Sequence, residues 1–164
     1  MKKLFIFTVL AMILSVSAPV HARDILGSPS QTAQEKQKLY TRLTVSQLCD
    51  LLEQWDSSCR PTVMDGAIKV RFDSINALFL PYDDGGALQY FVRFESDVPL
   101  DRVNLWNAEY RYARHYVKTL DDGSRVINME IDHPLTGGVS KKNIFEFFDL
   151  ARVLTRNLRQ NLEN

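Results

Sequence analysis

The stretch ALFLPYDDGGALQYFVRF, residues 77–94, decides the fold. Apolar and aromatic residues recur on both sides of Asp83-Asp84-Gly85-Gly86 with a period close to two, which is typical of half-buried strands. Asp and Gly are favoured in tight turns for local backbone reasons. Residues 77–80 and 88–94 are therefore predicted to form two strands of a hairpin.

The segments before this hairpin are predicted to add one strand and one helix. Residues 67–72 (AIKVRF) show the same two-residue period. Further upstream, Thr44-Val45-Ser46-Gln47 has the pattern of a capping box, and Leu43 and Leu48 have the spacing of a hydrophobic staple around it. Apolar residues then recur at helical spacing, so residues 45–55 are predicted to form a short amphipathic helix.

The segments after the hairpin predict a helix, a second hairpin and a long final helix. The first helix begins at 97–99 and runs to about Tyr112, and strands 113–120 and 125–132 follow. Ser140 is the predicted N-cap of the final helix. One apolar stripe follows on that helix: Ile144, Phe147, Phe148, Ala151, Leu154 and Leu158.

The predicted order is therefore α-β-β-β-α-β-β-α. Hairpins that alternate with helices are typical of an α+β domain, in which helices pack on one antiparallel sheet. The fold class predicted from the residues is this α+β arrangement.

The first 22 residues have the layout of a cleaved secretory signal peptide. Residues 2–3 are lysines, residues 4–16 are almost continuously apolar, and Val20 and Ala22 occupy the −3 and −1 positions. The apolar run is shorter than the roughly 20 residues that a membrane-spanning helix needs. We expect cleavage between Ala22 and Arg23, export to a bacterial periplasm or beyond, and no stable membrane anchor.

The remaining 142 residues would be enough for one domain with a normal core. They carry 18 lysines and arginines against 20 aspartates and glutamates, a net charge of −2. This balance gives no electrostatic reason to expect nucleic acid or an anionic membrane as a partner. Residues 23–42 are polar with little apolar periodicity, which predicts a flexible leader, or a frayed helix near residues 32–40, before a folded domain over residues 43–164.

Cys49 and Cys59 are the only cysteines in the sequence. An even pair in an exported protein predicts one structural disulfide. In the chain-entropy model, closing so short a loop stabilises the fold by about 2.5–3 kcal/mol. The ten-residue separation differs from the C-x-x-C spacing of redox-active pairs. Two free thiols are the alternative.

The predicted order of elements, with the residues that join them, resembles the YbjN domain family of bacteria. The residues that carry this resemblance are Asn104-Leu105-Trp106-Asn107 with Arg111, the hairpin 112–132 and Gly137-Gly138-Val139-Ser140 before a long aromatic-rich helix. The resemblance covers roughly residues 43–160. It implies a fold similar to that of type III secretion chaperones and a role in sensory transduction, and it brings no enzymatic activity or cofactor.

The residues that could carry catalysis or hold a metal do not form a coherent motif. A metal site would require His115 and His133 to converge with Glu130 or Asp132. A hydrolase would require Ser140, His133 and Asp132 to line up, and no nucleophile elbow surrounds Ser140. We therefore predict no catalytic residue, no metal and no cofactor.

Two segments are candidates for recognition. Gly137, Gly138 and Ser140 precede two lysines at a helix N-terminus, where backbone N–H groups can bind an anion, although a turn with a helix cap explains the same residues. The second segment follows on the middle helix: Asn104, Trp106, Asn107 and Arg111. Its three polar residues share one helix face and either hold neighbouring backbone or line a recognition groove, and Trp106 is typical of a core position.

We interpret the chain as an exported, non-enzymatic domain that binds a protein or has a regulatory accessory role in the bacterial envelope. Such a domain would bind through a sheet face or an apolar groove, and its partner is an unidentified protein or a second copy in a homodimer. A small-molecule or ion sensor with a pocket between sheet and helices is the alternative. An unrecognised hydrolase is the third hypothesis.

Overall fold

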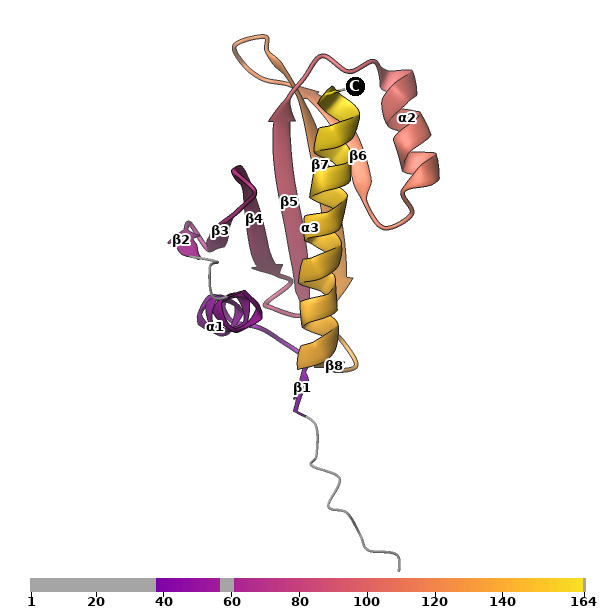
Figure 1. The fold of residues 1–164 in the computed structure, drawn as a ribbon. Helices are drawn as coiled ribbons and strands as arrows, with labels where there is room; N and C mark the ends of the chain where they lie inside the picture. The colour runs from indigo at the N-terminus through magenta and orange to yellow at the C-terminus, as the bar shows by residue number, and fades with distance from the viewer. Residues whose placement is uncertain (1–37, 57–60, 164) are drawn as a thin grey trace, which may run out of the picture. The chain divides into compact units, whose positions relative to one another are not determined.

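The computed structural model describes residues 38–56 and 61–163. The elements in chain order are β1 (Leu39–Tyr40), α1 (Val45–Trp55), β2 (Thr62–Met64), β3 (Ala67–Phe72), β4 (Ile75–Tyr82), β5 (Ala87–Glu95), α2 (Leu100–Glu109), β6 (Arg114–Thr119), β7 (Arg125–Pro134), β8 (Val139–Ser140) and α3 (Lys141–Glu163). Within the described residues, six strands form an antiparallel sheet in the order β2-β3-β4-β5-β7-β6, and β1 pairs with β8 (Figure 1). The predicted α+β class is confirmed.

Three short strands, β1, β2 and β8, were not predicted. β1 lies within residues 23–42, for which the sequence predicted a leader, and Leu39 pairs with Ser140 on β8. Two residues are too few to show a period, and β1 and β8 exist because these two segments meet. β2 was missed because all three of its residues are exposed, so it lacks the alternation that marks a half-buried strand.

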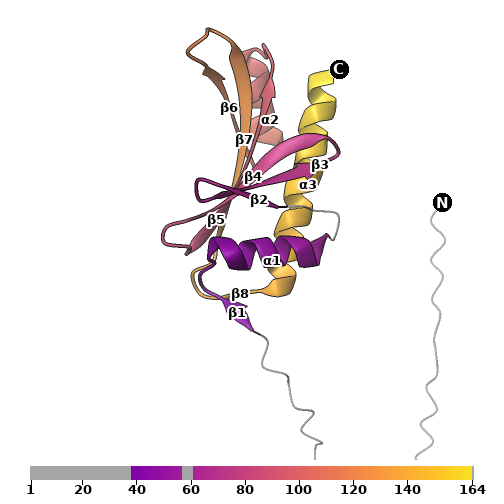
Figure 2. The ribbon, with the colours of Figure 1, turned by 90° about the vertical axis from the view of Figure 1, so that its left-hand side faces the viewer.

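All three helices pack on the same face of the six-stranded sheet (Figures 1 and 2). The register places Ile68, Phe79, Tyr90 and Ile131 in one row across four strands, and all four are buried. The ring of Phe79 lies 5.0 Å, centre to centre, from that of Phe148 on α3. The core is therefore the layer between this face and the helices.

The predicted caps of α1 and α3 are confirmed. Gln47 N donates to Thr44 Oγ1 over 3.2 Å, and Thr44 N donates to Gln47 Oε1 over 3.0 Å, which completes the capping box. Asn143 N donates to Ser140 Oγ over 3.2 Å, so Ser140 caps α3 while it also belongs to β8. The predicted apolar stripe of α3 is buried throughout: Ile144, Phe147, Phe148, Ala151, Leu154 and Leu158.

α2 is shorter and less buried than its sequence suggested. The prediction from 97–99 to about Tyr112 is too long, since α2 spans Leu100–Glu109. Leu100 and Leu105 are 63% and 55% exposed, because α2 packs beside the edge strand β6 and buries only a narrow side. Among the described residues, no helix is both long and apolar enough to cross a membrane.

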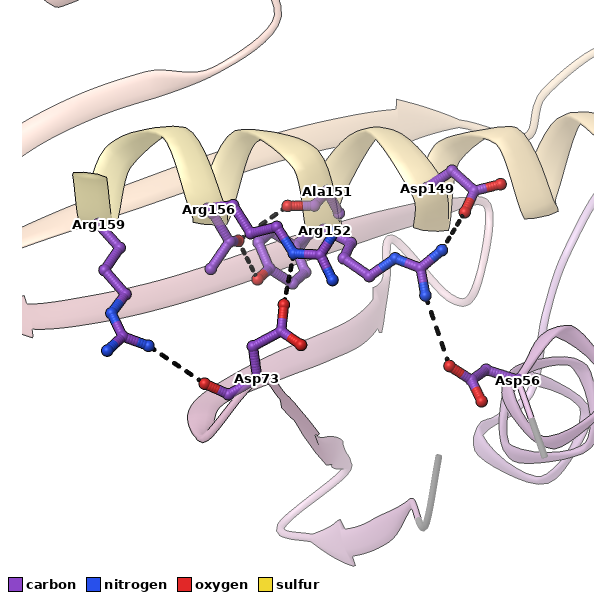
Figure 3. A network of polar contacts seen from close by, with 9 residues as sticks. Asp56, Asp73, Asp149, Ala151, Arg152, Arg156 and Arg159 are labelled. Atoms are coloured by element: carbon purple, nitrogen blue, oxygen red, sulfur yellow. Dashed lines mark hydrogen bonds and ion pairs between the residues drawn. The ribbon is translucent and has the colours of Figure 1, made fainter. Parts of the chain in front are cut away.

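Arginines of α3 bind the β3–β4 turn (Figure 3). Arg156 Nε donates to the carboxylate of Asp73, and Arg159 Nη1 donates to the Asp73 carbonyl over 3.2 Å. The hydrogen bond from Arg156 lowers the pKa of Asp73 below its usual range. One turn earlier, Arg152 lies 3.5 Å from Asp56 at the end of α1. The polar side of α3 thus connects parts of the chain that are far apart in sequence.

Candidate functional site: the uncovered face of the sheet

The second face of the six-stranded sheet is turned away from all three helices (Figure 2). Side chains alternate between the two faces of a strand, so the residues between the core positions point to this second face. We call it the open face and define it by the following residues: Lys69, Arg71, Asn76, Leu78, Leu80, Gln89, Phe91, Arg93, Glu95, Asn128, Glu130, Asp132, Arg114 and Tyr116.

The middle of the open face is apolar and hollowed. Leu78 pairs with Phe91 across β4 and β5, and both side chains are half-buried. They form the floor of a hollow of about 490 Å³ that extends to Met64 on β2, with Lys69 and Arg93 in its lining. A volume of this size is within the range of ligand sites in proteins.

The β6–β7 end of the open face is polar and internally paired. Arg114 and Tyr116 both donate to the carboxylate of Glu130. Burial alone would raise the pKa of Glu130, but these hydrogen bonds outweigh it, and the pKa lies below its usual range. Gln89 Nε2 donates to Asp132 Oδ1 over 2.9 Å. The carboxylates of this end therefore already have partners.

Arg93 is held between the apolar and polar parts. Its Nε donates to Asn128 Oδ1 over 2.9 Å, and its guanidinium carbon lies 5.5 Å from the centre of the Phe91 ring. Asn128 is fully buried, and its Nδ2 has no hydrogen-bond partner in the described part of the chain. Within the described residues, the Arg93 side chain donates only through Nε. The donors at the end of the guanidinium therefore remain available to other groups.

Each edge of the sheet has a feature that limits the addition of a further strand. At one edge, β2 has three residues and follows Pro61. At the other, Asn107 Nδ2 donates to the His115 carbonyl over 2.9 Å, and His115 N donates to Asn107 Oδ1 over 2.8 Å. The side-chain amide of Asn107 thereby occupies backbone groups that a partner strand would use.

These contacts separate the four residues that the sequence grouped on α2. Asn107 holds neighbouring backbone, and Trp106 is 4% exposed and packs in the core. Asn104 and Arg111 are exposed, and their side chains form no hydrogen bond or ion pair within the described residues. The four residues do not form one recognition surface.

The family follows from comparison with known proteins. A family model described as "YbjN: Putative bacterial sensory transduction regulator" matches residues 44–163. The chain belongs to the YbjN family. The resemblance inferred from the sequence is thereby confirmed.

A solved YbjN structure shares the fold. The crystal structure of YbjN from E. coli, described as "a putative transcription regulator", superposes with a TM-score of 0.53 at 17% sequence identity. The match covers 68% of this chain and 92% of the E. coli chain. At this identity the likeness shows the fold alone. A comparison with curated proteins gives no match.

In this YbjN domain the glycine segment before α3 forms a turn that leads into the N-terminal cap of the helix. Gly137 and Gly138 both have positive φ, at 95° and 91°, which glycine adopts readily. A Cβ on Gly138 would lie 3.2 Å from the side chain of Leu39, so this turn also makes room for β1. Lys141 Nζ donates to Gln54 Oε1 over 2.6 Å, which directs that lysine to α1.

The residues considered for hydrolysis or metal binding point in different directions. Asp132 and His133 are neighbours on β7 and therefore face opposite sides of the sheet. Asp132 bonds Gln89 on the open face, while His133 stacks on Phe147 in the core at 4.9 Å. Ser140 bonds Asn143. The three do not meet as a triad, and no metal-binding cluster of His, Cys, Asp and Glu occurs among the described residues.

The two histidines also lie far from each other. His115 pairs with Met129, and His133 is four residues further along β7, a separation of about 13 Å along a strand. Burial lowers the pKa of both histidines.

Of the two cysteines of the predicted disulfide, only Cys49 lies within the described residues. Cys49 is half-buried on α1 and is not in a disulfide, and burial raises the pKa of its thiol. Cys59 lies outside the described residues, as do the predicted signal peptide and its cleavage point at Ala22 and Arg23. The structure thus does not show the predicted disulfide, and both the disulfide and the export signal stay predictions.

The open face was not singled out from the sequence, although its strands were predicted. The alternation in residues 67–72 and 88–94 places Lys69, Arg71, Phe91 and Arg93 opposite the core positions. What the pattern lacked was the placement of the helices. Because all the helices lie on one side of the sheet, the alternate strand residues that point to the other side become candidates for binding.

Replacing Asn107 with alanine is expected to destabilise the domain by about 1–3 kcal/mol, because two backbone groups of His115 lose their partner. Asn104→Ala is the matched control on the same helix, and we expect its effect to stay within about 0.5 kcal/mol. Urea unfolding of the two variants measures the difference. Equal losses would show that Asn107 is not a structural clamp.

Proposed function

We propose that the protein is a non-enzymatic recognition domain that binds an extended segment of a partner protein on its open face. The observation that carries this proposal is the half-buried pair Leu78 and Phe91 at the floor of a hollow on a sheet face without helices. Apolar side chains at such a place gain from being covered. The family description as a regulator of sensory transduction supports a role exerted through binding.

The packing of the domain also favours this surface over the interior. Aromatic rings of Phe72, Phe79, Tyr90, Phe147 and Phe148 fill the layer between sheet and helices, with ring centres 5.0–6.4 Å apart. The hollow lies instead on the outer face of β2–β5. Because β2 is short and Asn107 occupies backbone groups of His115 on β6, we expect a partner segment to lie across the strands and to be recognised by side chains.

We further propose that the domain acts in the bacterial envelope after export. The support for this location is the layout of residues 1–22, with two lysines, an apolar run and Ala22 before the expected cleavage point.

The double variant Leu78→Ser/Phe91→Ser is expected to lose its partner while it keeps its fold. Both side chains are only half-buried, so we expect a cost of no more than about 2 kcal/mol in unfolding free energy. Chemical crosslinking of the tagged protein in cells, with thermal unfolding in parallel, measures both quantities.

The matched control is Leu105→Ser/Val153→Ser, which removes exposed apolar side chains from α2 and α3 on the helix side of the sheet. We expect every recurrent adduct of the wild type to persist in this control and to disappear in the open-face variant. Adducts that survive in a folded Leu78→Ser/Phe91→Ser variant would contradict the proposal.

A further inference from the structure

We infer that the open face selects a partner segment in which an acidic side chain stands beside an apolar one. This inference rests on the proposed function and adds the chemistry of the partner. It follows from a cluster of cations around the apolar hollow, formed by Lys69, Arg71 and Arg93.

The cations of this cluster lack carboxylate partners. Lys69 and Arg93 line the hollow, and Arg71 pairs in register with Asn76, another lining residue. None of the three forms an ion pair within the described residues, and Glu95 is the one acidic residue in the described lining. Elsewhere in the fold, arginines on the surface are commonly paired with carboxylates: Arg114, Arg125, Arg152, Arg156 and Arg159.

Arg93 is positioned to receive a carboxylate. Asn128 fixes its Nε and the face of Phe91 lies beneath the guanidinium carbon, so the guanidinium is held in place before a partner arrives. A guanidinium binds a carboxylate through two parallel hydrogen bonds, and little side-chain entropy is lost when the donor is already held.

Asn128, which holds Arg93, is itself fully buried. Its Nδ2 is a buried donor without a partner among the described residues, which costs free energy. Arg93 and Tyr116 are its two neighbours across the sheet. Asn128 is 0% exposed and does not line the hollow, so its part in this site is to hold Arg93 through Oδ1.

The spacing of an extended chain fits both features together. Successive side chains on one face of an extended segment are about 6.5–7 Å apart, and neighbouring strands of the sheet are about 4.8 Å apart. An apolar side chain seated on Leu78 and Phe91 therefore leaves its neighbours within reach of Arg93 on one side and Lys69 on the other. The open face would thus contact the acidic side chain and the apolar side chain of the partner at adjacent positions.

Selection from a displayed library of random nonapeptides tests this inference. The purified wild-type protein is expected to enrich segments that combine Asp or Glu with Phe, Leu, Ile or Val. The variant Lys69→Glu/Arg71→Glu is expected to enrich Lys or Arg in place of the acids. Neither side chain forms a hydrogen bond or ion pair in the described part of the chain, so this variant should keep the melting temperature of the wild type.

A synthetic peptide from the selection then tests Arg93 itself. Arg93→Gln is expected to weaken binding about tenfold, the order of one charge-assisted hydrogen bond. Arg111→Gln, an exposed arginine that follows α2, is the matched control and should leave the affinity unchanged.

The outcomes separate this inference from the proposed function. Peptides that depend on Leu78 and Phe91 but show no acidic preference would overturn the inference and leave the proposed function standing. A library that yields no enriched peptide, or only peptides that bind the Leu78→Ser/Phe91→Ser variant equally well, would overturn both.

Discussion

Replacing Phe79 with alanine is expected to destabilise the domain by about 3–5 kcal/mol. Its ring is fully buried at the centre of the core and contacts aromatic rings of β3, β5 and α3: Phe72, Tyr90, Phe147 and Phe148. Alanine would leave a cavity where sheet and helices meet, and these rings cannot all move in to fill it. Since small domains are stable by only about 5–15 kcal/mol, the variant should approach the limit of folding.

Phe91→Ala is the matched control for this loss. Phe91 lies on the neighbouring strand but on the open face, where it is half-buried. We expect it to cost about 1 kcal/mol. Denaturant unfolding of both variants measures the difference. A loss for Phe91→Ala as large as that for Phe79→Ala would mean that the open face is packed like a core and is not free to bind a partner.

Gly85→Ala is expected to cost about 3 kcal/mol or more. Gly85 has a φ of 81°, a conformation that costs alanine about 1–2 kcal/mol. An added Cβ would also lie 2.4 Å from the carbonyl oxygen of Leu43. That approach is backbone against backbone, and Leu43 N donates to the Gly85 carbonyl over 2.8 Å. The turn therefore holds the start of α1 against the β4–β5 hairpin, and alanine would push the two apart.

Gly123→Ala separates the backbone strain from the clash. Gly123 has a φ of 83°, nearly the same as Gly85, but a Cβ there would meet no described atom within 4 Å. Its expected cost is the backbone strain alone, about 1–2 kcal/mol. Melting temperatures and urea midpoints of the two variants give the comparison. Equal losses at the two glycines would show that the contact with Leu43 contributes nothing.

The sequence was sufficient for elements whose signals are local. The Thr44–Gln47 capping box, the Ser140 cap and the α3 stripe depend on residues within one or two turns, and all are present. β1 and β8 form only because distant segments meet, and no local pattern marks them. On α2, helical spacing alone could not show that Leu100 and Leu105 would remain exposed.

The candidate site was harder to predict because it depends on the relative placement of all elements. Asn107 and Arg111 share a helix face in the sequence, yet Asn107 binds the backbone of β6 and Arg111 stands in solvent. Conversely, Phe91 and Arg93 are typical strand residues with no motif of their own. Their importance follows from a sheet that is covered on one face only, and this is a property of the tertiary structure.

The most direct test of binding through the open face is site-specific photocrosslinking in cells. A photoreactive phenylalanine analogue is placed at position 91 on the open face or at position 153 on the exposed side of α3, where Val153 is 49% exposed. We expect discrete protein adducts from position 91 and none from position 153. Adducts only from position 153, or none from position 91 in a folded protein, would contradict the assignment of the open face as the binding surface.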